Sequence, residues 1–252
     1  MTTGTLIEAL DLPASSRVDQ RVPKKLLLEN GAPTAADKRH INEGIEELTW
    51  LAALKPTTIG VLEYRDDYRE YLEIAVLSAS LRPASKATRL VELVHRAIPY
   101  PVLLLTEQGE RGGISGAHKR WSQGVAGKTV LEGDIVAIEW DAEKDRAFWP
   151  VFRAALALGK QPHGSLLTVY QGWLDLLIAL QAARLTGVFA LAESPQRAAA
   201  RSDALRACAL LEAESARLRA AAAKERQVAR QVELNLELKR VEAALASAQH
   251  KL

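Results

Sequence analysis

The chain has 252 residues, of which 48% are apolar and 25% charged, so it suits a globular domain with an appendage rather than a disordered or fibrous protein. Lys and Arg number 33 against 31 Asp and Glu, for a net charge of +2, so no overall field attracts the whole molecule to nucleic acid or to a membrane. Cys208 is the single cysteine, which excludes an intrachain disulfide and any multi-cysteine metal site.

Residues 1–33 are predicted to form a surface arm. The segment DLPASSRVDQRVPKK contains two prolines and a basic cluster, which are typical of an exposed, irregular segment. The chain does not start with a basic stretch followed by an apolar run, and no later segment reaches the roughly 18 uninterrupted apolar residues of a membrane span. We therefore expect a cytoplasmic protein without membrane contacts.

Residues 34–190 are predicted to form an α/β head, which begins with a helix. Thr34 and Asp37 resemble a capping box, and Ile41, Ile45, Leu48 and Ala52 follow at helical spacing towards Pro56. The segments TTIGVLEY and YLEIAVLSASL are β-branched and apolar, which predicts two strands joined as a hairpin.

The second half of the head is predicted to alternate helices and strands less regularly. A helix follows Ser85, and 102–105 is a continuous apolar run, as in a strand covered on both faces. A glycine-rich turn then leads to a return strand, and KTVLEGDIVAIEW gives another. Helices over 145–160 and 165–186 should cover the sheet. The expected fold class is α+β, with a mixed sheet of about five strands covered by helices.

Residues 194–252 are predicted to form a long C-terminal helical, coiled-coil-like arm, because they are rich in Ala, Leu, Glu, Arg and Gln. Two apolar stripes run along it, and the seam shifts between 228 and 234. A continuous heptad repeat would not shift, so the arm is expected to change partner or fold back there. The residues predicted to bind a partner are Leu211, Leu218, Val232, Leu236, Leu238, Val241 and Leu245.

The segment SQGVAGKT, at 122–129, resembles a phosphate-binding loop but has Ser122 in place of the first glycine. Such a loop needs a helix directly after it, whereas VLEGDIVAIEW predicts a strand. We therefore interpret it as a loop between strands that contains Lys128. Nucleotide binding at Lys128 is the less favoured hypothesis, and no cofactor is expected.

Glu63 and Glu73 are the candidate catalytic residues of the alternative function, a metal-dependent nuclease. Carboxylates on neighbouring strands can hold a divalent metal, but a restriction-endonuclease-type core would have a lysine two residues after the second acid, where this chain has Ala75. The five histidines lack zinc-ligand spacing, and Cys208 suits packing better than catalysis. No metal site is expected, and a non-enzymatic role is favoured.

Two basic clusters could bind nucleic acid through its phosphates. The residues concerned are Arg21, Lys24 and Lys25 in the N-terminal segment, and Lys119 and Arg120 beside Trp121. A chain with this many basic residues also produces such clusters by chance.

The runs RVPKK, EELTWLAALKPTTIGV, LEIAVLSASL, AIPYPVLLL and KERQVARQVELNLELKRVEAAL, in this order, resemble the bacterial family of domain of unknown function 4391. The resemblance extends from about Leu10 to about Leu245. It implies no established activity. Members of that family are often encoded beside helicases and adenine methyltransferases, so the resemblance implies an accessory role in antiphage defence or restriction-modification.

Our leading hypothesis is therefore a non-catalytic interaction subunit of such an assembly. Its arm would dock onto a larger DNA-acting protein partner, a helicase or methyltransferase of the same gene cluster, or mediate self-association.

Overall fold

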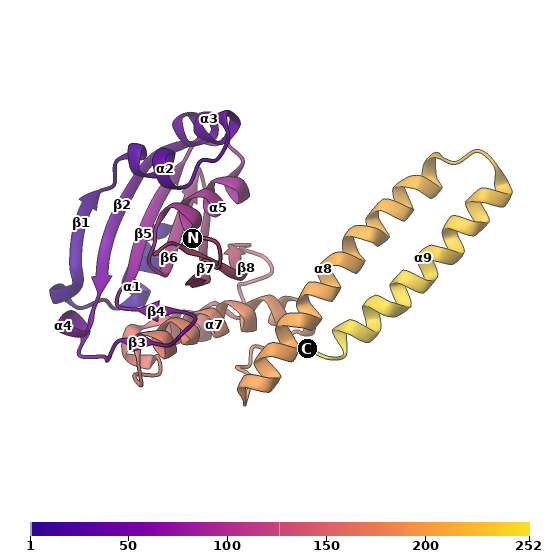
Figure 1. Ribbon diagram of the computed structural model, residues 1–252. Helices are drawn as coiled ribbons and strands as arrows, with labels where there is room; N and C mark the ends of the chain where they lie inside the picture. Colours follow the sequence, from indigo (N-terminus) through magenta and orange to yellow (C-terminus); the bar gives the residue numbers. More distant parts are fainter. Residues whose placement is uncertain (1, 126) are drawn as a thin grey trace. The chain divides into compact units, whose positions relative to one another are not determined.

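The computed structural model describes residues 2–125 and 127–252 (Figure 1). The chain divides into two compact units, one up to Leu177 and one from Ile178 onwards. We refer to them as the head and the C-terminal unit.

The head is built on a six-stranded mixed sheet. Its strands are β1 (Arg17–Arg21), β2 (Ile45–Leu54), β5 (Ile74–Leu81), β6 (Val102–Gln108), β7 (Arg111–Trp121) and β8 (Thr129–Glu139), and they lie side by side in that order. All neighbours are antiparallel except β5 and β6, which are parallel and joined through helix α5 (Ala87–Ala97). The α+β class and the mixed sheet are confirmed.

Helices cover both faces of this sheet. On one face, α2 (Lys24–Asn30), α3 (Ala35–Gly44) and α5 enclose a core with alternate residues of β5, namely Ala75, Leu77 and Ala79. The opposite face is covered by α7 (Leu166–Thr186), whose Tyr170 hydroxyl contacts the backbone of β6 and β7. Helices α1 (Thr3–Leu10) and α6 (Trp149–Leu156) pack together in the head.

The helix predicted from Thr34 to near Pro56 begins as expected with Thr34 as its N-cap, but it is wrong beyond Gly44, where β2 begins. The register of β2 against β5 shifts between Ile45 and Glu47 and again between Trp50 and Ala52. Such bulges break the alternation of buried and exposed residues, so the spacing of the buried residues imitates a helix.

The predicted hairpin between 57–64 and 71–81 is also wrong. Residues from Pro56 form the short helix α4 (Pro56–Ile59), and the strand β3 (Tyr64–Arg65) pairs only with β4 (Glu70–Tyr71) as a separate ribbon. β5 pairs instead with β2 and β6. The first 33 residues differ from the expected arm, because they contain α1, the single turn η1 (Ala14–Ser16), α2 and the edge strand β1.

The last predicted helices of the head are present with changed lengths. Helix α6 is followed by a turn, η2 (Leu158–Lys160), whereas α7 matches the predicted 165–186 segment closely. By length and composition α7 could cross a membrane, but 67% of its most apolar 18-residue window is buried within the protein. Such burial is typical of a core helix in a globular protein.

The C-terminal unit contains a hairpin of two long helices, α8 (Pro195–Lys224) and α9 (Val228–Gln249), so the arm folds back at 225–227 (Figure 1). Leu218 and Ala222 of α8 pack against Leu234, Leu238 and Val241 of α9. Arg219 and Glu242 form an ion pair of 2.7 Å across the hairpin. In α9 the buried and half-buried positions recur alternately every four and three residues, at Leu234, Leu238, Val241, Leu245 and Ala248. The other stripe of the sequence crosses the turn, from Leu211, Leu218 and Ala222 of α8 to the exposed Val232 and Leu236 of α9. The seam therefore shifts where the chain turns.

Candidate functional site

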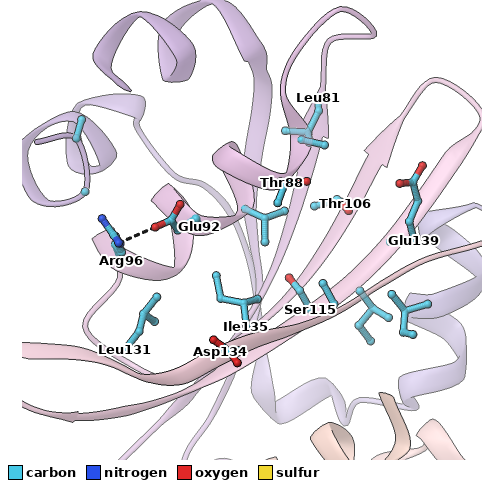
Figure 2. A pocket seen from close by; sticks show the side chains of 18 of the residues that line it. Leu81, Thr88, Glu92, Arg96, Thr106, Ser115, Leu131, Asp134, Ile135 and Glu139 are labelled. Carbon is cyan, nitrogen blue, oxygen red and sulfur yellow. Dashed lines mark ion pairs between the residues drawn. The ribbon is translucent and has the colours of Figure 1, made fainter. Parts of the chain in front are cut away.

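A cleft of about 920 Å³ lies on the head between α5 and the β7–β8 hairpin (Figure 2). The wall on α5 presents Thr88, Val91 and Arg96, and the strand β8 presents Leu131 and Ile135. This size is within the range of small-molecule sites. No pattern in the sequence predicted this cleft, because its two walls come from segments far apart in the chain.

Two opposite ends of the cleft differ in chemistry. The Thr129 hydroxyl donates to the Pro99 carbonyl at 3.0 Å, which ties the start of β8 to the chain just beyond α5. Lys128 and Arg96, which both line the cleft, therefore belong to the same end. The other end lies by the first turn of α5, where Thr88 faces Thr106 of β6 (Figure 2).

Ser115, in the floor of the cleft, lies 3.0 Å from Nε2 of His95 on α5. A serine–histidine pair can generate a nucleophile when the histidine is basic and held by a third group. Here burial lowers the pKa of His95 to about 3, and Nδ1 of His95 has no hydrogen-bond partner within the described residues. His95 is therefore a poor base, and we interpret the pair as structural.

Lys119, predicted to bind nucleic acid, is buried and wrongly placed for that role. Its ammonium donates to the carbonyls of His95 and Ile98 at the C-terminal end of α5. Positive charge is favourable at a helix C-terminus. Burial lowers the pKa of Lys119 to about 8. Lys119 therefore fastens β7 to α5 and cannot reach a phosphate in solution.

A hydrogen-bonded chain of polar residues joins the β3–β4 ribbon to β7 and α7. Tyr71 bonds Nδ1 of His118, and Nε2 of His118 lies 2.8 Å from Oε1 of Gln171. Gln171 then donates to Asp175 at 2.8 Å. Burial lowers the pKa of His118, so the ring is neutral, with Tyr71 donating to Nδ1 and Nε2–H donating to Gln171. We interpret this chain of residues as a structural link between these elements.

The nuclease residues Glu63 and Glu73 have different surroundings. Glu63 is exposed in the loop before β3, whereas Glu73 is buried and its Oε2 lies 2.8 Å from Nζ of Lys55. A lysine thus lies beside Glu73, but it comes from the residue that follows β2 and not from two residues after Glu73. Within the described residues, no group of three or more His, Cys, Asp or Glu could hold a metal ion. Glu73 is paired with Lys55, and nuclease activity stays a hypothesis.

The segment that resembles a phosphate-binding loop connects β7 to β8, so a strand follows it and no helix does. The amides of Gly124 and Val125 donate to the Ser122 hydroxyl at 3.3 and 3.2 Å. These amides therefore already have an acceptor in the loop itself. Residue 126 of the motif lies outside the described residues. The interpretation as a loop between strands is confirmed.

The other predicted nucleic-acid ligands lie in balanced surroundings. Lys24 donates to the Asn42 carbonyl at 3.0 Å, and burial followed by the charges of Arg82 and Arg21 lowers the pKa of Lys24. Lys25 pairs with Glu29 at 3.7 Å. Arg82 was missed in the sequence because β5 brings it beside Lys24 only in the fold. Arg21 pairs with Glu47 at 3.9 Å, and the charge of Glu46 acts on Lys24, so the cluster is partly neutralised.

Arg120 is half-buried and its guanidinium donates to the Trp121 carbonyl at 3.1 Å. That bond is local and uses only one of the donors of the side chain. A contact between Arg120 and nucleic acid stays a prediction.

The residues predicted to bind a partner fall into two groups. Leu218, Leu238 and Val241 pack inside the hairpin, and Leu211 and Leu245 are half-buried at seam positions. Val232 and Leu236 are 52% and 53% exposed, and Val228, one helical turn earlier, is 74% exposed. Only this second group is available to another protein. We call Val228, Val232 and Leu236 the α9 patch.

Comparison with known proteins gives one match. No curated protein and no solved structure matches the chain. A family model described as "Domain of unknown function (DUF4391)" matches residues 10–245, which is nearly the whole chain. The protein belongs to the DUF4391 family.

Proposed function

We propose that this protein is a non-catalytic accessory subunit of a bacterial antiphage defence or restriction-modification assembly in the cytoplasm. Its α8–α9 hairpin docks onto a DNA-acting protein partner, a helicase or a methyltransferase. The observation that carries the proposal is the α9 patch, which remains exposed although the hairpin has already buried its own seam.

The α9 patch suits a protein partner because its residues follow one another at four-residue spacing on one helix. Residues four apart lie on the same side of a helix, so one partner surface can cover all three. The neighbouring charges are largely satisfied within the unit: Arg219 pairs with Glu242 at 2.7 Å, and Arg230 with Glu233 at 2.6 Å. Such a surface offers apolar area without a strong field, and an aliphatic side chain that becomes fully buried contributes about 1.5–3 kcal/mol.

The head supports a non-catalytic role. Burial keeps His95 and His118 neutral, which makes both poor general bases. The buried carboxylate of Glu73 is paired with Lys55. The head would then act as a scaffold.

The test uses the full chain co-expressed with a helicase and an adenine methyltransferase of a bacterial defence cluster that contains a member of this family. We expect a stoichiometric complex with one of them by size-exclusion chromatography and light scattering. The double variant Val232→Asp/Leu236→Asp should weaken that complex at least tenfold, because each carboxylate would be buried against apolar surface.

The matched control is Leu210→Asp, a residue on α8 that is 68% exposed but lies outside the α9 patch. This control should bind the partner like the wild type. A chain that elutes alone beside both candidates contradicts the proposal. A homodimer that the double variant abolishes would assign the α9 patch to self-association instead.

A further inference from the structure

The cleft between α5 and β8 has a positively charged end. Asp37 and Glu92 balance the guanidinium groups of Arg89 and Arg96, with contacts of 2.6 to 2.8 Å. Lys128 is exposed and forms no ion pair within the described residues, so it adds a cation to this end. The carboxylates of Glu29, Asp134 and Glu139 also line the cleft, where Glu29 pairs with Lys25 at 3.7 Å and Glu139 with Arg111 at 3.4 Å. Arg96 and Lys128 both line this end of the cleft.

The middle of the cleft is apolar. Val91 of α5 lines it, together with Leu131 and Ile135 of β8, which extend from the strand towards the helix in Figure 2. All three are only partly buried, so they expose aliphatic surface that no other part of the head covers. A flat, weakly polar group inserted between the two walls would remove this surface from water.

The far end of the cleft offers hydroxyl groups. Thr88 and Thr106 line it, and neither side chain has a hydrogen-bond partner within the part of the chain that the structure describes. Thr88 and Arg96 are eight residues apart on α5, which corresponds to about 12 Å along the helix axis. A ligand that uses both ends must therefore be elongated.

We propose that this cleft binds a nucleotide. A nucleoside phosphate has an anionic phosphate at one end, a flat base, and a base edge that forms hydrogen bonds at the other end. These three parts match the charged end, the apolar middle and the hydroxyl-bearing end of the cleft. The phosphate contacts Arg96 and Lys128, the base lies between Val91 and Ile135, and its edge bonds the two threonine hydroxyls. This site is separate from the α9 patch. It also differs from a phosphate-binding loop, in which backbone amides would hold the phosphate, because here side chains hold it.

The experiment measures binding to the full chain by isothermal titration calorimetry and thermal shift. The probes are AMP, GMP, CMP and UMP, with each free nucleoside and inorganic phosphate as separate arms. We expect at least one nucleotide to raise the Tm and to bind at least tenfold more tightly than its nucleoside or phosphate. Arg96→Gln should weaken that binding at least tenfold, and Thr88→Val should weaken it a few-fold.

Arg82→Gln is the matched control, because Arg82 is exposed on the head and does not line the cleft. Ile135→Trp fills the cleft without touching the ion pairs, so it should abolish binding even if Arg96→Gln fails to fold. The proposal is overturned if no nucleotide binds the wild type, if phosphate binds as tightly as every nucleotide, or if Ile135→Trp binds like the wild type. None of these results depends on the protein partner of the α9 patch.

Discussion

Tyr170→Phe is the most informative substitution in the head, because one hydroxyl joins α7 to two strands. The β7–β8 register shifts between Gly116 and His118, so the amide of Ala117 lies outside the regular ladder. That amide donates to the Tyr170 hydroxyl at 2.8 Å, and the hydroxyl donates to the Val102 carbonyl at 2.7 Å. Tyr170 thus satisfies the group that the bulge leaves unpaired.

Phenylalanine would keep the ring packing but leave the Ala117 amide and the Val102 carbonyl without this partner. Each buried polar group left unsatisfied costs about 1–3 kcal/mol, so we expect the free energy of unfolding to fall by about 2–4 kcal/mol. Urea unfolding followed by tryptophan fluorescence measures this in the head alone, because all five tryptophans precede Leu177. The control Tyr68→Phe, on a side chain that is 71% exposed, should change stability little. A loss below about 0.5 kcal/mol for Tyr170→Phe would refute the argument.

Three further predictions concern acid stability, the hairpin and the nuclease alternative. Because burial lowers the pKa of His95 to about 3 and also lowers that of His118, the unfolded chain binds protons that the folded chain cannot. Stability should be intact above about pH 6.5 and fall below it by about 1.4 kcal/mol per pH unit for His95, with a further loss from His118. Urea unfolding at pH 7.5 and 5.5 checks this, and equal stability at both would contradict it. Leu218→Ala, at a buried position between the two helices, should destabilise the hairpin by about 2–4 kcal/mol in circular-dichroism melts, and Leu236→Ala, at an exposed position, by under about 0.5 kcal/mol. Equal effects would disprove the assignment of Leu218 to the buried face and Leu236 to the exposed face. Plasmid DNA with Mg²⁺ or Mn²⁺ should stay intact, and cleavage that Glu73→Gln abolishes would revive the nuclease.

Elements with an undisturbed local pattern could be predicted from the sequence. β5 and β6 are apolar runs bounded by turns, and α5 and α7 carry long apolar faces, so all four appear near their expected positions. β2 could not be identified because its two bulges replace alternation by a helix-like spacing. The shift of the apolar seam did indicate that the arm changes direction, and the structure folds it back at 225–227.

The candidate sites were less predictable, because they depend on which distant segments meet. Lys55 approaches Glu73 from the neighbouring strand, so a search for a lysine close in sequence misses it. Lys119 carried a basic-cluster signal, but strand alternation turns it into the core beneath α5. The stripe in the arm mixed seam residues with surface residues, and only the pairing of α8 with α9 separates Leu218 from Val232.

The central claim, that the α9 patch binds a DNA-acting partner, is tested most directly by site-specific photocrosslinking. A photoreactive amino acid is placed at Val232, which is 52% exposed, and in a separate variant at Leu210, which is 68% exposed. The candidate helicase and methyltransferase are present in each reaction. The account predicts a crosslink to one of these two proteins from position 232 and little from position 210. Crosslinks of equal strength from both positions, or none from position 232, would contradict it.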